Sequence, residues 1–475
     1  MTEMANKRQK LNMYTPSPPE LMSLQDGDGG LEDTIQTILK ELNDRSGTQE
    51  QINLLTNEIN PTMEFYKQKF HMGVLKSNDI GNIVSLCQKL LLVVPIKNSI
   101  LRQQNRITDC FSGVVCLIAL NNFLYSGNGS LITLEALKSL SNFNLNVSDT
   151  EYLIGIIHFA KELERYAVGR ATAGDVKSVV LCKSVVTEIL EELMNFDFRN
   201  GPIRRQYDGV KYCKKRLEDI LYELSLGMNE NNTSEFSSPT NYSPISKDEF
   251  KGLQDRMKEY DQLRENVIKQ SRDIQKLGKN CVYSLHRGGK SILKAQEQLA
   301  EGKQKAIEIA NTYLKQEPTL RNGTYANAIE EWAEGRIYEE WLKCTDTNKI
   351  LSLKEIRVDI PELTLDEYLG GLGDFTGEVG RFAVAAATRR DKTLVTKARV
   401  VVMNVSKILL HINMNGKVPS RMFKKISTLR NNLKKLEHLS YELSLVKGSK
   451  VISSGMSDGN NGGRNKKKDD NDEED

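Results

Sequence analysis

The stretch EYLIGIIHFAKELERYAVGRATAGD (151–175) decides the fold, because it occurs a second time as EYLGGLGDFTGEVGRFAVAAATRRD (367–391). The two copies align without a gap, and twelve of the 25 positions are identical. The pentapeptide YELSL also occurs twice, at 222–226 and at 441–445. Two matches in the same order indicate that the chain is a tandem duplication of one folding unit.

Apolar residues recur at i, i+3, i+4 and i+7 over long stretches, which predicts amphipathic helices. These stretches are 81–101, 151–169, 176–197, 206–226, 250–284, 291–315, 325–343, 391–412 and 421–445. Alternation with period two is rare, and only 11 prolines occur in 475 residues. Helix starts are expected at Ser148/Asp149, Ser246/Asp248 and Asp391. We therefore predict an all-α protein whose long helices pack in bundles.

Composition divides the chain into two halves of similar size. The segment MNENNTSEFSSPTNYSPISK (228–247) is rich in Asn, Ser and Pro, which is typical of a linker that buries no core. The predicted organisation is a disordered arm (1–30), a helical domain (31–227), a disordered linker (228–247), a second helical domain (248–446) and a disordered charged tail (447–475).

Composition also bounds the compartment. The longest apolar run, Gly113–Leu120, is shorter than the ~18 residues that a spanning helix needs, so no membrane contact is expected. The seven cysteines are scattered without a CxxC, which argues against a disulfide framework and a zinc site. The N-terminus is polar. These features predict a cytoplasmic and/or nuclear protein.

Charged residues are scarce in the second copy of the repeated stretch. Between 368 and 388 the only charged side chains are Asp374, Glu378 and Arg381. Asp374 and Glu378 lie at i and i+4, so their carboxylates share one helix face. In the first copy His158 stands in the place of Asp374. An apolar helix face with two carboxylates requires a positive partner.

A second acidic face follows from the segment AIEEWAEGRIYEEW, where Glu331 and Glu334 lie at i and i+3. Four carboxylates on two helices form the kind of oxygen-rich site that suits Mg²⁺ or Mn²⁺. A metal there could polarise a phosphate and activate water. The residues alone leave two simpler interpretations open, a solvated acidic face for Glu331 and Glu334 and a salt bridge, for instance to Arg381, for Asp374 and Glu378.

Several motifs resemble the translin family. The first half, with ATAGD (171–175) and RQYDGVKY (205–212), is similar to translin itself. The second half, with SRDI (271–274), AIEEWAE (328–334) and EYLGGLGDFTGEVGR (367–381), is similar to translin-associated factor X. The resemblance implies two bundles of about seven helices each. In that family the two proteins are separate chains, whereas here a linker joins them.

The resemblance also implies a function. Family members of the two kinds co-assemble into a hollow octameric shell that binds and cuts single-stranded RNA, with four acids in the factor X subunit. On this sequence those acids fall on Glu331, Glu334, Asp374 and Glu378. We therefore expect a Mg²⁺-dependent (or Mn²⁺-dependent) endoribonuclease acting in small-RNA or tRNA-fragment processing, with single-stranded RNA or DNA as partner and four fused chains forming the shell.

Basic residues are the candidate RNA contacts. The resemblance places one basic cluster at 101–110, where Arg102 matches and Arg106 replaces a family histidine. Other candidates are Arg204, Arg205, Lys211 and Lys214, followed by Arg389 and Arg390 just past the acid-bearing helix. A solvated helix face is the alternative for the basic residues near 204–216. The five histidines are expected to be ordinary surface or core residues.

Two rival functions stay open. In one, the protein is a non-catalytic scaffold that binds RNA or DNA, and the four acids form structural salt bridges. In the other, it is a structural helical protein without a nucleic-acid partner. Cleavage that EDTA abolishes separates the nuclease from the scaffold, and retention of labelled RNA separates the scaffold from the structural protein.

Overall fold

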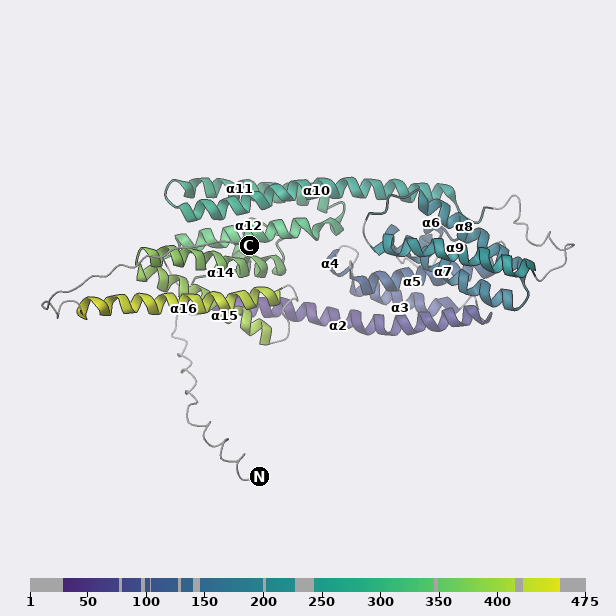
Figure 1. Ribbon diagram of the computed structural model, residues 1–475, viewed down its shortest axis with the longest axis horizontal. Helices are drawn as coiled ribbons and strands as arrows, with labels where there is room; N and C mark the ends of the chain where they lie inside the picture. The colour runs from purple at the N-terminus through teal and green to yellow at the C-terminus, as the bar shows by residue number, and fades with distance from the viewer. Residues whose placement is uncertain are drawn as a thin grey trace, which may run out of the picture.

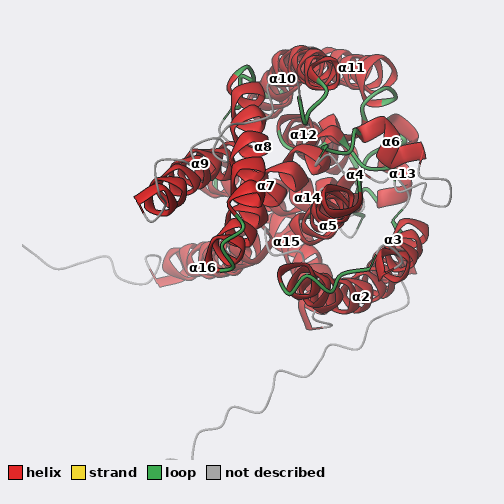
Figure 2. Ribbon diagram, turned by 90° about the vertical axis from the view of Figure 1, so that its right-hand side faces the viewer, coloured by secondary structure: helices red, strands yellow, loops and turns green. Residues whose placement is uncertain are grey.

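The computed structural model describes residues 29–76, 79–94, 99–102, 104–126, 130–139, 146–199, 202–226, 243–345, 349–414 and 422–452. All regular structure in these ranges is helical, as Figure 2 shows. The all-α fold predicted from the sequence is therefore confirmed. Residues 1–28 of the predicted arm, 228–242 of the predicted linker and 453–475 of the predicted tail lie outside the described residues, whereas residues 29–30 and 447–452 are helical.

The helices of the two halves follow one another along the chain. In the first half they are α2 (Gly29–His71), α3 (Ile80–Val93), α4 (Ser99–Arg102), α5 (Asn105–Tyr125), α6 (Leu134–Ser139), α7 (Asp149–Thr172), α8 (Val176–Met194) and α9 (Pro202–Leu226). In the second half they are α10 (Lys247–Arg287), α11 (Ser291–Ile309), α12 (Thr324–Lys343), α13 (Leu353–Asp359), α14 (Leu365–Thr388), α15 (Lys392–Met414) and α16 (Met422–Ile452). A π-helical turn (Ala310–Leu314) and a 3₁₀ turn (Pro318–Arg321) connect α11 to α12.

The repeated stretch forms α7 in the first half and α14 in the second, and both helices begin in the same way. Ser148 and Thr364 are the N-caps, and each exchanges hydrogen bonds with the glutamate three residues later in a capping box. These bonds satisfy backbone N–H groups that lack a partner inside the helix. The helix starts predicted at Ser148 and Ser246 are confirmed, and Asp391 accepts a bond from Leu394 N at the start of α15.

Sequence patterns did not predict the long helix α2. Its 43 residues include Gly47 and Pro61, and the apolar residues follow no continuous stripe. The reason lies in its surroundings, because the two ends of α2 pack against different cores. The apolar core of the first half includes Ile52 and Phe70 of α2, whereas the core of the second half includes Ile38 and Leu42.

Helix α10 also contributes to both cores, with its start in the first core and its later part in the second. Phe250 and Leu253, near its start, lie in the core of the first half, and Val267 to Leu285 contribute to the core of the second half. Figure 1 shows α2 and α10 running along opposite sides of the molecule, each reaching from one bundle to the other. Each half therefore completes its core with the first turns of the other half's long helix.

Ion pairs fix the crossing helices. Arg45 Nη1 of α2 lies 2.8 Å from Asp366 Oδ1 in the first turn of α14. In the other half, Arg256 Nε of α10 lies 2.8 Å from Asp149 Oδ2 in the first turn of α7. The two contacts are counterparts, since each long helix places an arginine on the N-terminus of the other half's repeated helix. An aspartate in a first helical turn also interacts favourably with the helix dipole.

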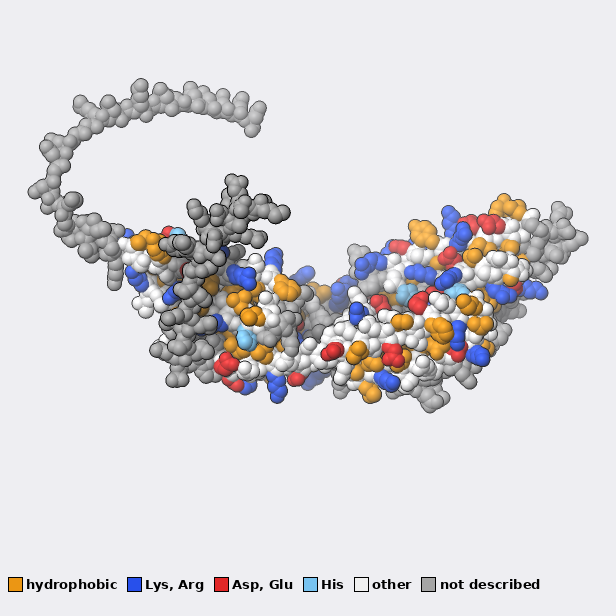
Figure 3. All heavy atoms as spheres, turned by 90° about the horizontal axis from the view of Figure 1, so that it is seen from below, with side chains coloured by type: hydrophobic (Ala, Val, Ile, Leu, Met, Phe, Trp, Pro, Cys, Tyr) orange, Lys and Arg blue, Asp and Glu red, His pale blue; other side chains and the backbone are white. Residues whose placement is uncertain are grey.

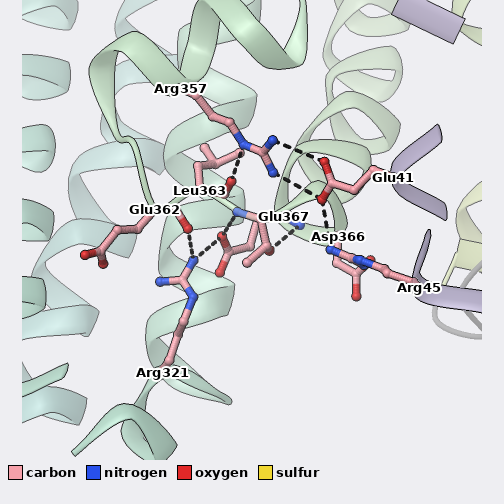
Figure 4. A network of polar contacts seen from close by, with 9 residues as sticks. Glu41, Arg45, Arg321, Arg357, Glu362, Leu363, Asp366 and Glu367 are labelled. Carbon is pink, nitrogen blue, oxygen red and sulfur yellow. Dashed lines mark hydrogen bonds and ion pairs between the residues drawn. The ribbon is translucent and has the colours of Figure 1, made fainter. Parts of the chain in front are cut away.

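Figure 4 shows the network around the start of α14. Arg357 Nη1 lies 3.1 Å from Glu41 Oε2 of α2 and its Nε donates to the carbonyl of Leu363. Arg321 Nη2 donates to the buried carboxylate of Glu367 at 2.7 Å and to the carbonyl of Glu362. A network of this kind joins α2 rigidly to the second bundle.

One described helix, α5, is long and apolar enough to cross a membrane by length and composition. In the structure 72% of its most apolar window is buried, and residues from Ile107 to Phe123 lie in the first core. Helix α5 therefore serves as the central core helix of the first bundle.

Candidate active site

Glycines let three helices of the second bundle approach one another at the predicted acidic site. A Cβ atom on Gly371 of α14 would lie 2.9 Å from the backbone nitrogen of Glu334 and 3.0 Å from the carbonyl oxygen of Glu330, both in α12. A Cβ atom on Gly278 of α10 would lie 2.9 Å from the carbonyl oxygen of Glu331. The helices therefore touch through their backbones at the positions where α12 carries its acids.

The four predicted acids lie in one electrostatic site. Glu334 is buried, with 9% of its surface exposed. Burial, followed by the negative charges of Asp374, Glu378 and Glu331, raises the pKa of Glu334 to about 8. Ionisation of Glu334 is unfavourable because the group is buried and because the neighbouring carboxylates make the local potential negative.

A lysine that the sequence analysis did not identify lies among these acids. Lys425 of α16 places its Nζ 2.5 Å from Asp374 Oδ2 and 2.5 Å from Glu330 Oε1, and it donates to the carbonyl of Gly370 at 3.0 Å. Burial lowers the pKa of Lys425, but the hydrogen bonds to Asp374 and Glu330 outweigh burial and raise it above the ordinary value. Lys425 therefore stays protonated and neutralises part of the acidic charge.

Glu378 is held from two sides. Its Oε2 lies 2.7 Å from His286 Nε2 and 2.9 Å from Arg381 Nη1. The other ring nitrogen of His286 lies 3.2 Å from the hydroxyl of Tyr338. The salt bridge with Arg381, left open by the sequence, is therefore present, and His286 contacts a candidate catalytic acid instead of being an ordinary surface or core histidine.

Glu331 lies at the outer side of the site, where 24% of its side chain is exposed. Its Oε1 accepts a hydrogen bond from Gln275 Nε2 at 3.5 Å and lies 3.4 Å from Lys279 Nζ, both in α10. The lysine itself is largely exposed, so this ion pair is weak and the carboxylate is accessible.

The donor chemistry fits a hard divalent cation, because carboxylate oxygens are the ligands that Mg²⁺ and Mn²⁺ prefer. The raised pKa of Glu334, caused first by burial and then by the neighbouring carboxylates, is a second sign of fit, since a bound cation would favour the ionised form. In this conformation, however, no three His, Cys, Asp or Glu side chains of the described residues converge closely enough to hold a metal. Asp374 and Glu378 face Lys425 and His286 instead, so binding would require their side chains to turn.

The first bundle provides an internal comparison. Gly155 corresponds to Gly371, and its Cβ atom would contact Val115 and the carbonyl of Ser112 in α5. Val115 and Ser112 take the places that Ala333 and Glu330 have in the second bundle. In this alignment, Gly113 and Cys116 correspond to Glu331 and Glu334. The first bundle thus lacks three of the four acids and keeps only Glu162.

Glu162 makes the same histidine contact as Glu378. Its Oε2 lies 2.8 Å from His71 Nε2. His71 is the last residue of α2, and His286 lies in the last turn of α10. Because the histidine–glutamate pair occurs in both halves, it belongs to the shared fold. The ion pair of Asp374 with Lys425 has no such counterpart. In the first half, His158 takes the place of Asp374 and forms a hydrogen bond with Gln206.

Arg102 does not fit its predicted role as an RNA contact. Its side chain is 9% exposed, its guanidinium group pairs with the buried carboxylate of Glu151, and it lies 4.1 Å from the ring centroid of Phe111. Arg321 and Glu367 form the same pair in the second half at 2.7 Å. Arg102 therefore compensates a buried charge of the fold and does not reach the surface.

The other basic candidates are at least partly exposed. Arg204, Arg205 and Lys211 lie on the exposed face of α9, with Lys214 half-buried beside them. Acids of the same helix lie 3.8 to 3.9 Å from Arg204, Lys211 and Lys214. Arg106 is exposed and donates to Asn53 Oδ1 at 3.0 Å. On the face seen in Figure 3, Lys and Arg side chains lie among Asp and Glu side chains rather than in one basic patch.

Arg389 and Arg390 form the exposed turn after α14. Arg390 has a left-handed backbone with φ of 57°, and the corresponding residue of the first half is Gly174 with φ of 75°. An arginine is therefore held in a conformation that the fold otherwise gives to glycine, which is the kind of local strain found at functional positions.

The model of the Translin family matches residues 34–227 and again 262–447.

The chain belongs to the Translin family. Translin of Gallus gallus is 32% identical over 127 residues, which cover 25% of this chain and 55% of that protein. The "Translin-associated protein X homolog" of Schizosaccharomyces pombe is 23% identical over 212 residues, covering 43% of this chain and 90% of that protein. The chain therefore joins a translin-like half to a half like translin-associated protein X.

The match spans about half the length of the translins. Among solved structures, the one titled "Crystal structure of apo-NeC3PO" aligns with a TM-score of 0.36 at 19% identity, covering 44% of this chain and 99% of that chain. A likeness of this size adds nothing to the assignment, which depends on the two family matches.

Proposed function

We propose that this translin-family chain is a metal-dependent endoribonuclease that binds single-stranded RNA and cuts it at the acidic site of the second bundle. The observation that supports this proposal most directly is the burial of Glu334 among Asp374, Glu378 and Glu331, with its pKa raised to about 8. Strongly perturbed pKa values of this kind are concentrated at functional sites. The first bundle, built on the same fold, lacks the cluster.

The four acids are the proposed ligands of the metal. Glu331, Glu334, Asp374 and Glu378 would hold Mg²⁺ or Mn²⁺, which when bound polarises a phosphate and lowers the pKa of water. Glu334, the most buried of the four acids, is proposed to take up a proton from the attacking water. His286 orients the Glu378 carboxylate from the opposite side.

RNA would be held by exposed basic side chains. Arg389 and Arg390 lie directly after the helix that carries Asp374 and Glu378, and Arg204, Arg205, Lys211 and Lys214 present a basic face of α9. Guanidinium and ammonium groups bind phosphate oxygens without reading the base, so we expect a binding constant that falls steeply with salt. The contacts of these basic residues with acids are long and would not prevent phosphate binding.

The decisive experiment compares two matched variants on a short, labelled, single-stranded RNA. Glu378→Gln should reduce cleavage by at least about 100-fold, as expected when a carboxylate that binds a catalytic metal is lost. Glu162→Gln removes the corresponding glutamate of the first bundle, which also contacts a histidine, and should leave cleavage unchanged. EDTA should abolish cleavage by the wild-type protein.

A non-catalytic RNA-binding scaffold is the second candidate. It is favoured by the ion pairs of Asp374 with Lys425 and of Glu378 with Arg381, which resemble structural salt bridges. RNA that binds to the wild-type protein and stays intact in the presence of Mg²⁺ and of Mn²⁺ would establish the scaffold and refute the nuclease.

We further propose that four copies of the chain assemble into a closed shell around the RNA, each copy supplying one bundle of each kind. The expected mass in light scattering is about 215 kDa, four times 53.7 kDa. A mass of one chain would refute this assembly.

A further inference from the structure

The contacts of Lys425 differ from those of an ordinary surface lysine. Its Nζ touches three acceptors on two helices: Asp374 Oδ2, Glu330 Oε1 and the carbonyl oxygen of Gly370. An ammonium group has three donors, so all of them are used. The side chain is 22% exposed, which places the charge inside the acidic site rather than in solvent.

The fold makes room for this side chain. A Cβ atom on Gly373 would lie 3.1 Å from Lys425 Cδ, so the aliphatic stem crosses α14 where that helix lacks a side chain. The first bundle has Ile157 in the place of Gly373 and Gln206 in the place of Lys425. The lysine, the glycine that admits it and the aspartate that it contacts therefore occur together only in the bundle that carries the acidic cluster.

We propose, on the basis of the proposed function, that Lys425 is the resident counter-ion of the metal site and competes with the divalent cation for Asp374. An Asp374 oxygen at 2.5 Å from an ammonium group cannot at the same time coordinate a divalent ion from that side. Coordination of a cation through Asp374 Oδ2 would therefore release the Lys425–Asp374 contact, while the contact with Glu330 can remain. Lys425 acts as a positioning residue that keeps the acids together before the ion arrives.

The test measures Mn²⁺ binding directly, by electron paramagnetic resonance of free Mn²⁺, on the full-length chain without RNA. Lys425→Gln is the main variant, because glutamine occupies the corresponding position of the first bundle and should be tolerated. Removing a positive charge this close to the ligands should tighten Mn²⁺ binding by at least about tenfold. Lys425→Arg keeps the charge and should bind Mn²⁺ less tightly than Lys425→Gln.

The control is Lys424→Met, since Lys424 lies next to Lys425 on α16 but points into solvent. It should bind Mn²⁺ as the wild-type protein does. Thermal unfolding provides a second measurement: in EDTA, Lys425→Gln should melt below the wild-type protein, and saturating Mn²⁺ should raise its melting temperature more than that of the wild type.

The possible results separate the two proposals. Equal or weaker Mn²⁺ binding by Lys425→Gln, with clear binding by the wild-type protein, would overturn the competition and leave the metal site standing. Absence of Mn²⁺ binding by every variant and by the wild-type protein would refute the metal site itself, and the role of Lys425 with it.

Discussion

Glu334 shows how function and stability conflict at single residues. A carboxyl group whose pKa is raised by burial and by Asp374, Glu378 and Glu331 destabilises the free protein above its ordinary pKa, because the unfolded chain ionises it more easily. Glutamate is therefore a poor choice for the fold alone at this position. The first bundle, which carries Cys116 there, avoids the conflict.

This conflict predicts the pH dependence of one variant. The folded pKa of Glu334 is about 8 against an ordinary value of 4.5, so its unfavourable contribution is absent below pH 4.5 and grows as the pH rises to 8. In EDTA, Glu334→Gln should thus be about 1 to 3 kcal/mol more stable than the wild-type protein at pH 8, with little difference at pH 4.5. Urea unfolding at both pH values measures this, and a difference that does not change with pH would contradict it.

Arg390 makes a second prediction at the same scale. A non-glycine residue with φ of 57° is strained by about 1 kcal/mol, and the matching Gly174 relieves that strain in the first bundle. Arg390→Gly should therefore raise the stability by about 0.5 to 1 kcal/mol and weaken RNA binding at low salt. Arg389→Gly, at an ordinary backbone angle, should bring no gain in stability. A less stable Arg390→Gly would show that the arginine supports the fold.

At the scale of helices, glycines place the acids. Gly371 and Gly278 allow α14 and α10 to reach the backbone of α12 next to Glu330, Glu331 and Glu334. The same contact occurs in the first bundle through Gly155, so close helix packing is a property of the fold. The second bundle uses it to bring acids of two helices together.

The element-scale prediction compares two glycines of α14. Gly371→Ala should destabilise the protein by about 1 to 3 kcal/mol and impair cleavage, because the new methyl group would lie 2.9 Å from the Glu334 nitrogen. Gly377→Ala has no atom within 4 Å and should be neutral or stabilising by up to ~1 kcal/mol. Thermal unfolding of both variants tests this. Equal melting temperatures would show that α14 and α12 can move apart to accommodate a methyl group at residue 371.

Sequence patterns predict the local features of the fold and of the candidate site, but not the contacts between distant segments. The capping residues Ser148 and Thr364 and the pairing of acids at i and i+4 are local, so they can be predicted from neighbouring residues. Lys425 could not be predicted, since it lies 51 residues from Asp374 and reaches it only through the packing of α16 on α14. Helix α2 escaped prediction because its apolar residues face two different cores.

At the scale of the whole molecule, the exchange of helix ends determines how the halves hold together. Ile38 and Leu42 of α2 are buried in the second core, and Phe250 and Leu253 of α10 are buried in the first. Arg45 and Arg256 add an ion pair at each crossing. The predicted linker contributes its last described residues as well, since Ile245 is buried in the first core.

This exchange predicts the result of cutting the chain. A specific protease site placed between residues 227 and 242, outside the described residues, should yield two fragments that still elute together from a sizing column. Buried apolar contacts at both crossings keep them associated at micromolar concentration. Substituting Leu42 and Leu253 by Asp should make the cut fragments separate. Fragments that separate without these substitutions would contradict the exchanged arrangement.

The exchange has a consequence for biosynthesis. On the ribosome, the apolar side chains of Ile38 and Leu42 emerge early, yet the second core that covers them is complete only at Leu436, roughly 390 residues later. At translation rates of about 5 to 20 residues per second, these side chains stay uncovered for about 20 to 80 seconds. Nascent chains of this protein should therefore engage a chaperone at their N-terminal segment until the last helix has been made.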